Sequence, residues 1–317
     1  MKILITGIHG FVGSNLVKAM GRNHEIYGLD IVSSEKEGVV KTFSWKDFDE
    51  DKVPQVDAII HLAGKAHDLK NTSGPEVYFK VNTGLTQKIY DWFLKSSAKK
   101  FIFFSSVKAA ADFVPGDILT EDIVPNPVGP YGESKIKAEE YILSHLAADK
   151  QVYILRPCMI HGPGNKGNLN LLYGVVKRGV PWPLGAFENR RCFTSIGNLC
   201  FAIEKLLIQP VQSGIYNMGD DESLSTNELI AIICNALGKR THIWHLPKGL
   251  MNGMAKVGDV LHLPLNSERL TKLTENYVVS NAKIKKALGI DKMPIRAEEG
   301  LTPVSYTHLR AHETGRN

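Results

Sequence analysis

Cysteine is scarce in this sequence, with four among 317 residues, and none of the four belongs to a CxxC pair. Their spacing from the histidines does not match a metal site, so neither a metal centre nor a disulfide framework is predicted. We expect free thiols, in a reducing compartment, at positions Cys158, Cys192, Cys200 and Cys234.

Long hydrophobic runs and runs of like charge are also missing. No stretch approaches the roughly 18 apolar residues of a membrane span, and the first residues do not form a signal peptide. The net charge of +5 is mild and spread along the chain, so neither nucleic acid nor a membrane is indicated as a partner. A basic site for a phosphate ligand fits the charge equally well. A cytoplasmic globular protein is therefore expected.

The last fourteen residues differ in character from the rest. The stretch VSYTHLRAHET, from Val304 to Thr314, matches the translation, in one frame, of an adapter used in transposon-based sequencing libraries. We therefore interpret 304–317 as a non-native addition and leave it out of the fold prediction.

Short apolar runs alternate with amphipathic stretches through the first half of the chain. Runs that are apolar throughout indicate strands covered on both faces, and their alternation with helices indicates right-handed βαβ units. The pattern predicts an α/β fold with a Rossmann-type, doubly wound parallel sheet. The expected strands are 2–7, 25–30, 57–64, 99–106 and 151–157, and the expected helices are 12–20, 81–97 and 134–148.

The regular alternation of strand and helix patterns ends after Pro157. Gly, Pro and Asn crowd 161–168 and 178–191, which predicts long loops, and such loops are commonly functional. A helix at 196–208 and a strand at 214–220 return to the sheet, and a helix follows with Ser225 or Thr226 as its cap and Gly238 as its end. We expect a Rossmann domain over 1–156, with a returning segment near 191–220. A smaller, mostly helical lobe at the C-terminal side would take 157–190 and 221–303.

Three glycines lie between the first strand and the first helix, in TGIHGFVG. A glycine-rich turn lets a pyrophosphate approach the backbone, and the first amides of the helix carry partial positive charge. Asp30 ends the next strand, where a carboxylate accepts hydrogen bonds from the adenosine ribose and repels a 2′-phosphate. The arrangement predicts a dinucleotide site that favours NAD over NADP.

The spacing Gly-x-x-Gly-x-x-Gly resembles the extended branch of the short-chain dehydrogenase/reductase superfamily. Four more stretches carry the resemblance, in the family's order: HLAG at 61–64, Asn82 in VNTG, Ser105 and Ser106 after FIFF, and YGESK from Tyr131 to Lys135. The resemblance implies a bound NAD. It would be held by Gly7, Gly10, Phe11, Val12, Gly13, Asp30, Leu62, Ala63, Gly64, Asn82, Tyr131 and Lys135.

Tyr131 and Lys135 are four residues apart in a helical stretch, which places both side chains on one face. Free tyrosine, with a pKa of about 10, is a weak acceptor of protons near neutral pH, and we expect the Lys135 ammonium to lower that pKa. The resemblance implies that Tyr131 takes a proton from a sugar hydroxyl while hydride leaves to the cofactor. Ser106, at the carboxyl end of a strand, would bind the same oxygen. Ser106, Tyr131 and Lys135 are thus the expected catalytic residues.

The second half resembles nucleotide-sugar enzymes of that branch. The segment LRPCMIHGPG matches their Arg-Pro and Gly-Pro-Gly stretch, and Asn168 and Leu169 match an asparagine-led helix that contacts the nucleotide diphosphate. Arg191 falls on the family's phosphate-binding arginine, and a guanidinium offers a planar fork of donors that suits a diphosphate. The smaller lobe is therefore expected to bind the substrate through Ser106, Asn168, Leu169 and Arg191.

Within the branch, the chain resembles the UDP-glucose 4-epimerase-like subgroup, which also contains 4-ketosugar reductases of surface-polysaccharide synthesis. Val107 and Lys108 follow Ser106 where 4,6-dehydratases carry an Asp-Glu pair, which argues against dehydration. The resemblance implies a 4-epimerase of a UDP-hexose or UDP-N-acetylhexosamine. The alternatives are an NAD(P)H-dependent reductase of a UDP-4-keto-6-deoxy sugar and, more remotely, a non-catalytic NAD-binding sensor.

The family also suggests an assembly. Its members often dimerise through two helices packed as a four-helix bundle, and the segments near 82–97 and 134–148 provide two such helices. A homodimer is therefore one expectation, beside a UDP-sugar as the small-molecule partner.

Overall fold

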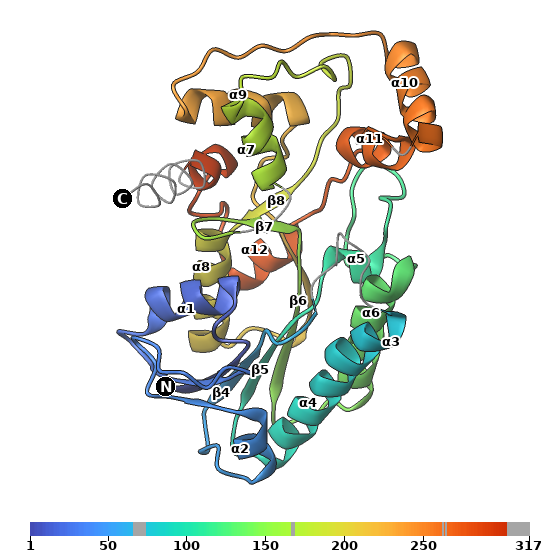
Figure 1. The fold of residues 1–317 in the computed structure, drawn as a ribbon. Helices are drawn as coiled ribbons and strands as arrows, with labels where there is room; N and C mark the ends of the chain where they lie inside the picture. Colours follow the sequence, from blue (N-terminus) through green and yellow to red (C-terminus); the bar gives the residue numbers. More distant parts are fainter. Residues whose placement is uncertain (66–73, 166–168, 262, 264, 303–317) are drawn as a thin grey trace.

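A parallel sheet of seven strands forms the centre of the computed structural model, which describes residues 1–65, 74–165, 169–261, 263 and 265–302 (Figure 1). The strand order is β3-β2-β1-β4-β5-β6-β9. Chain order runs outward in both directions from the neighbours β1 and β4, the point at which such sheets bind ligands. The strands are β1 (Lys2–Thr6), β2 (Glu25–Leu29), β3 (Lys41–Phe43), β4 (Ala58–His61), β5 (Lys100–Phe104), β6 (Gln151–Pro157) and β9 (Gly214–Met218).

Both faces of the sheet are covered by helices. Successive strand residues alternate between two buried layers: Ile3 and Ile5 belong to one and Leu4 to the other. The first layer includes residues of α1 (Phe11–Met20), α8 (Ile196–Ile208) and α12 (Ala282–Leu288). The second includes residues of α2 (Trp45–Asp49), α4 (Leu85–Lys95) and α6 (Gly129–Ser144). The predicted Rossmann-type, doubly wound α/β fold is confirmed.

Three short helical pieces lie near the carboxyl ends of the strands. They are α3 (Pro75–Tyr78), the π-helix η1 (Phe79–Gly84) and α5 (Val107–Ala110). The π-helix joins α3 to α4 and contains Asn82, whose side chain is fully buried. Single π-turns of this kind are rare and occur often at functional sites.

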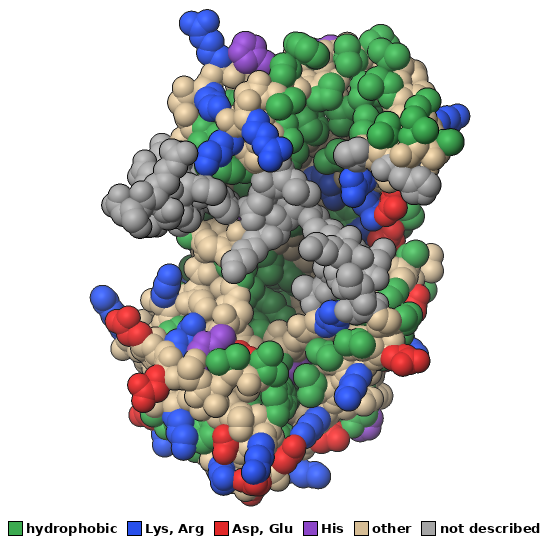
Figure 2. Space-filling model, in the orientation of Figure 1, with side chains coloured by type: hydrophobic (Ala, Val, Ile, Leu, Met, Phe, Trp, Pro, Cys, Tyr) green, Lys and Arg blue, Asp and Glu red, His purple; other side chains and the backbone are tan. Residues whose placement is uncertain are grey.

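The smaller lobe lies over the carboxyl edge of the sheet (Figure 1). It contains α7 (Leu169–Lys177), α9 (Thr226–Ala236), α10 (Lys248–Leu261) and α11 (Ser267–Thr274), and a two-stranded sheet of β7 (Met159–His161) and β8 (Phe193–Ser195) lies at its base. Residues of these four helices share an apolar core with Trp182 and Leu184. Figure 2 shows the molecule hollowed between this lobe and the sheet, with apolar side chains on the floor of the hollow.

Several local predictions are confirmed. The helix expected at 196–208 has those bounds, and α9 begins after a capping box of Ser225 and Glu228 and is followed by Gly238 with φ of +63°. The three-residue strands β3, β7 and β8 were not predicted, since they are too short to show a hydrophobic period. We expected 221–303 in the smaller lobe, whereas α12 packs in the sheet's apolar layer through Ile284 and Leu288.

No helix in the described ranges is both long and apolar enough to cross a membrane.

Candidate active site

The glycine-rich turn follows β1 and leads into α1. Gly7 has φ of +71°, and a methyl group added there would lie 3.0 Å from the Ala63 nitrogen. A methyl group at Gly13 would lie 2.7 Å from the carbonyl oxygens of Gly7 and Ile8. The turn therefore admits no side chain at either position, and Gly10 caps the N-terminus of α1. This cradle at a helix N-terminus fits the pyrophosphate of a dinucleotide.

Asp30 follows β2 at the same edge. Its carboxylate accepts hydrogen bonds from the His9 nitrogen at 2.9 Å and the Ile31 nitrogen at 2.7 Å. The first bond ties the carboxylate to the glycine-rich turn, which is where an adenosine ribose would need it. Phe11 and Val12, also expected at the cofactor, pack partly buried against the apolar layer under the turn.

The segment after β4 lies between that turn and Asn82. The Leu62 and Ala63 nitrogens donate to the Thr6 hydroxyl at 3.1 and 2.9 Å. A methyl group added at Gly64 would lie 3.0 Å from Asn82 Oδ1 and 3.2 Å from Lys135 Nζ. The glycine therefore lets Asn82 and Lys135 approach the chain closely, and the structure brings these predicted cofactor residues together.

Asn82 connects three parts of the site. Its Oδ1 accepts from the Lys65 nitrogen at 2.7 Å, and its Nδ2 donates to the Lys65 carbonyl at 3.1 Å and to Ser134 Oγ at 3.0 Å. Ser134 in turn donates to the Tyr131 carbonyl at 2.9 Å. The buried amide thus holds the loop after β4 against the first turns of α6.

The expected catalytic residues meet at the carboxyl end of β5. Ser106 caps α5, and its oxygen accepts from the Lys108 nitrogen at 3.2 Å. Tyr131 and Lys135 lie one turn apart on α6, and the Ser106 hydroxyl is hydrogen-bonded to the Tyr131 phenol. Tyr78 contacts the Tyr131 ring edge to face, with ring centroids 6.4 Å apart.

One sequence expectation about this group is wrong for the structure as it stands. We expected Lys135 to lower the pKa of Tyr131, but burial raises the pKa of the phenol, and only the Ser106 hydrogen bond acts in the opposite direction. Lys135 is engaged elsewhere: its Nζ donates to the Phe104 carbonyl at 2.7 Å and lies 5.1 Å from the centre of the Phe103 ring. Burial lowers the pKa of Lys135 to about 8, although the nearby Glu139 carboxylate acts to raise it.

Sequence reasoning missed a buried ion pair beside these residues. Glu139, one turn beyond Lys135, accepts from Arg156 Nε at 3.0 and 3.1 Å and from its NH2 nitrogen at 2.5 Å. The two side chains are at most 1% exposed, and Ser105 donates to the same carboxylate. The sequence did contain a signal for this pair. Arg156 is a charged residue within an apolar strand, and Glu139 is a charged residue on the buried face of a helix.

His61 forms a second buried connection. The Thr6 hydroxyl accepts from two backbone nitrogens, so it donates to His61 Nδ1 at 2.7 Å. His61 Nε2 therefore carries the proton and donates to Thr86 at 3.0 Å, and Thr86 donates to the Asn82 carbonyl at 2.6 Å. Burial, with a contribution from Lys135, lowers the pKa of His61 to about 3. The neutral imidazole joins the end of β1 to the π-helix.

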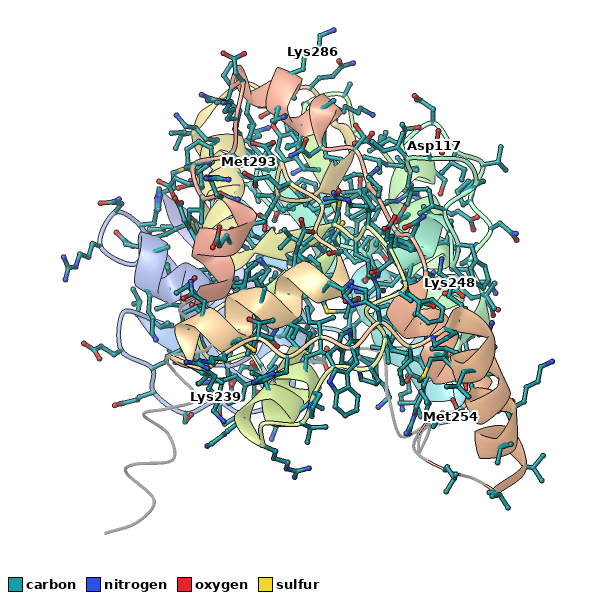
Figure 3. The ribbon with its side chains drawn as sticks, turned by 90° about the horizontal axis from the view of Figure 1, so that it is seen from above. Asp117, Lys239, Lys248, Met254, Lys286 and Met293 are labelled. Atoms are coloured by element: carbon teal, nitrogen blue, oxygen red, sulfur yellow. The ribbon has the colours of Figure 1, made fainter. Side chains whose placement is uncertain are left out.

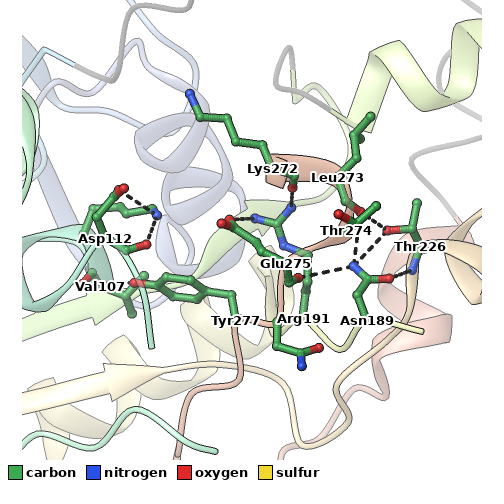
Figure 4. Close-up of polar contacts among 12 residues, drawn as sticks. Val107, Asp112, Asn189, Arg191, Thr226, Lys272, Leu273, Thr274, Glu275 and Tyr277 are labelled. Atoms are coloured by element: carbon green, nitrogen blue, oxygen red, sulfur yellow. Dashed lines mark hydrogen bonds and ion pairs between the residues drawn. The ribbon is translucent and has the colours of Figure 1, made fainter. Parts of the chain in front are cut away.

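The smaller lobe contributes Arg191. Its guanidinium donates to the Lys272 carbonyl at 2.5 Å and lies 3.5 Å from the Glu275 carboxylate (Figure 4). Tyr277, nearby, donates to the Ala111 carbonyl at 2.7 Å and lies 3.3 Å from the Val107 carbonyl, so this cluster contacts the helix that Ser106 begins. Glu275 and Tyr277 were not predicted, because they pair with Arg191 across more than eighty residues of sequence.

The other two substrate predictions differ in outcome. Asn168 lies outside the described residues. Leu169 begins α7, but its side chain is buried in an apolar cluster with Phe193, Leu229 and Leu301. Only its backbone is therefore placed to meet a ligand, at the N-terminal end of the helix.

Known proteins resemble the chain over nearly its whole length. It is 30% identical to the UDP-glucose 4-epimerase of Vibrio cholerae, over 98% of this chain and 96% of that one. It is 25% identical to the GDP-6-deoxy-D-talose 4-dehydrogenase of Aggregatibacter actinomycetemcomitans, over 74% of this chain and 79% of the other. A solved UDP-glucose 4-epimerase of Thermotoga maritima shares the fold, with a TM-score of 0.76 at 20% identity over 98% of this chain and all of that one. Residues 3–219 match the family described as NAD dependent epimerase/dehydratase, and the chain belongs to that family.

Proposed function

We propose that the protein is an NAD-dependent 4-epimerase of a UDP-hexose or a UDP-N-acetylhexosamine. The observation that carries the proposal is the meeting of Ser106, Tyr131 and Lys135 at the edge of the sheet, beside a glycine-rich turn built for a dinucleotide. The likeness to 4-epimerases over nearly the whole chain supports the same reaction class.

The residues divide the work as follows. Tyr131 exchanges a proton with the C4 hydroxyl of the sugar, and Ser106 hydrogen-bonds the same oxygen and orients it. Lys135, held by the Phe104 carbonyl, keeps a positive charge on the face of α6 that carries Tyr131. The glycine-rich turn and Asp30 would hold NAD, which would supply a reversible hydride acceptor for C4 and, when oxidised, a positive charge that opposes the rise in the pKa of Tyr131 caused by burial.

The substrate's diphosphate is assigned to the smaller lobe. Arg191 offers it a guanidinium, and the start of α7, with Asn168 and Leu169, offers backbone donors. Dehydration is disfavoured at this site, because the positions after Ser106 hold Val107 and Lys108, and Lys108 is paired with Asp112 at 3.0 Å.

Proton NMR of the purified protein, mixed with UDP-glucose or UDP-N-acetylglucosamine and no added cofactor, tests the proposal. We expect new anomeric signals of the galacto configuration over hours. The absence of any change with either sugar, in folded protein shown to hold NAD, would contradict the epimerase for those two sugars.

A second candidate is a reductase of a UDP-4-keto-6-deoxy sugar, which would use the same three residues. The similarity to a 4-dehydrogenase of a 6-deoxy sugar nucleotide favours it. It predicts stoichiometric loss of NADH absorbance at 340 nm with a 4-keto-6-deoxy UDP-sugar, and no turnover without added cofactor. An epimerase would turn its substrate over without added cofactor and would consume no NADH.

Two further expectations belong to this proposal. All four cysteines are buried free thiols, which supports a reducing, cytoplasmic setting. A homodimer formed through α4 and α6 stays a prediction, which sedimentation velocity can test.

A further inference from the structure

Helix α10 carries two apolar stripes instead of one. Met251, Ala255 and Gly258 are buried in the core of the smaller lobe. A second stripe, with the spacing i, i+4, i+7 and i+11 of one helix face, is exposed to solvent. It consists of Leu250, Met254, Val257 and Leu261, whose exposed fractions are 53%, 49%, 53% and 61%.

The exposed stripe belongs to a larger apolar surface. Trp244, 56% exposed, lies in the segment that leads into α10, and Val260 is 76% exposed on the helix itself. Figure 2 shows apolar side chains gathered over the upper right of the molecule, where Figure 1 places α10. Single exposed apolar residues are ordinary, but a contiguous set of this kind marks an interaction surface.

Basic residues accompany this surface. Within α10 the chain has two exposed cations, Lys248 and Lys256, and a single acidic residue, Asp259. The Asp259 carboxylate accepts hydrogen bonds from the Ser267 nitrogen and hydroxyl, which begin α11. Figure 3 shows α10 at the outer edge of the molecule, with Lys248 at its start and Met254 further along it.

An apolar stripe with cations beside it and an exposed tryptophan nearby is complementary to a bilayer with anionic headgroups. A second copy of the chain is disfavoured, because a symmetric contact through α10 would bring Lys248 and Lys256 of both copies to one interface. With 14 residues, α10 is shorter than the roughly 20 that span a bilayer, so it would lie on the surface.

We propose that α10 docks the smaller lobe onto an anionic lipid bilayer. The stripe of Leu250, Met254, Val257 and Leu261 enters the boundary between headgroups and acyl chains, and Lys248 and Lys256 reach the phosphates. Because α10 packs on α11 and shares a core with α7 and α9, docking places the substrate lobe at the membrane surface.

Vesicle flotation of the full chain tests this proposal. We expect the protein to float with vesicles of phosphatidylglycerol and phosphatidylcholine, and to float less with phosphatidylcholine alone. Leu250→Ser, Met254→Gln and Val257→Ser combined should lower the partition coefficient at least tenfold. Lys248→Gln and Lys256→Gln should each lower it about fivefold on the anionic vesicles only.

Two controls keep the outcome interpretable. Ile31→Ser and Val124→Ser remove residues that are 85% and 83% exposed elsewhere, and they should leave flotation unchanged. Circular dichroism melting should show that every variant is folded. Folded wild-type protein that does not float with anionic vesicles overturns the proposal, and so does a stripe variant that floats as well as wild type. A concentration-dependent dimer that the stripe variant abolishes, without flotation, would assign the surface to a second copy instead.

Discussion

The two halves of the candidate site hold their charged groups in different ways. At the sheet, the Arg156 and Glu139 side chains are 1% and 0% exposed and bonded at both carboxylate oxygens. In the smaller lobe, the Arg191 and Glu275 side chains are 21% and 15% exposed, and their closest ion-pair distance is 3.5 Å. The first pair fixes the helix that carries Tyr131 and Lys135. In the second pair, the proposed diphosphate would replace Glu275 as the partner of the Arg191 guanidinium.

The polar side chains around each pair differ in the lengths of their hydrogen bonds. Asn82, Ser134 and His61 are fully buried and joined in continuous hydrogen-bonded chains. In the smaller lobe, Asn189 is also buried, but it donates to the carbonyls of Leu273 and Glu275 over longer distances of 3.3 and 3.4 Å (Figure 4). We infer that the sheet half is the more rigid of the two.

Tyr131→Phe gives the largest expected effect. Losing a positioned proton donor and acceptor should lower the epimerisation rate about 10²–10⁴-fold, because the reacting oxygen keeps Ser106 but has no group to exchange its proton. Initial rates by NMR measure the loss. Tyr141→Phe is a matched control on the same helix, where the hydroxyl donates to Asp91 at 2.6 Å, and it should retain activity within about twofold. Comparable losses in both variants would remove Tyr131 from the mechanism.

A pair of isosteric substitutions compares the two ion pairs directly. Glu139→Gln leaves Arg156 charged and uncompensated in the interior, and we expect about 3–5 kcal/mol less stability. Glu275→Gln leaves Arg191 partly exposed and still bonded to the Lys272 carbonyl, so a cost of at most about 1 kcal/mol is expected. Urea unfolding measures both. Equal costs would contradict the contrast between a rigid half and an adjustable half.

Arg191→Gln should act on substrate binding. Removing a charge-assisted contact to a diphosphate costs about 1.5–3 kcal/mol, which corresponds to a KM raised about 10–100-fold with kcat nearly unchanged. Arg190→Gln is the neighbouring control, since that side chain is 58% exposed and bonds the Ser223 carbonyl. A fall in kcat with unchanged KM would place Arg191 outside the proposed role.

The sequence predicted the parts of the molecule that are encoded locally. Apolar runs predicted β1, β2, β4, β5, β6 and β9, because strands covered on both faces need no polar residues. Ser225 or Thr226 was expected to cap the helix at this point, and Ser225 is the residue that precedes α9. The helical spacing of Tyr131 and Lys135 likewise predicted their shared face.

The rest depends on contacts between distant segments. Nothing in the local sequence FKVNTG predicts a π-helix at Asn82, and the bonds of Asn82 to Lys65 and Ser134 exist only in the folded chain. No local pattern pairs Glu139 with Arg156 or Arg191 with Glu275. The direction of the Tyr131 pKa also needed the structure, because only the folded chain shows that the phenol is buried and that Lys135 is bonded to the Phe104 carbonyl.

A last expected effect concerns His61 and pH. The pKa of His61 is about 3 in the folded chain, so between about pH 6 and pH 3 the unfolded chain binds a proton that the folded chain does not. Its contribution to stability is therefore lost as the pH falls, at up to about 1.4 kcal/mol per pH unit. The geometry gives the reason: a proton on Nδ1 would meet the Thr6 hydroxyl, whose oxygen already accepts from Leu62 and Ala63. In His61→Gln, unfolding free energies measured from pH 6.5 to pH 4.5 should fall less steeply than in wild type. An unchanged slope in His61→Gln would show that the folded chain accepts the proton.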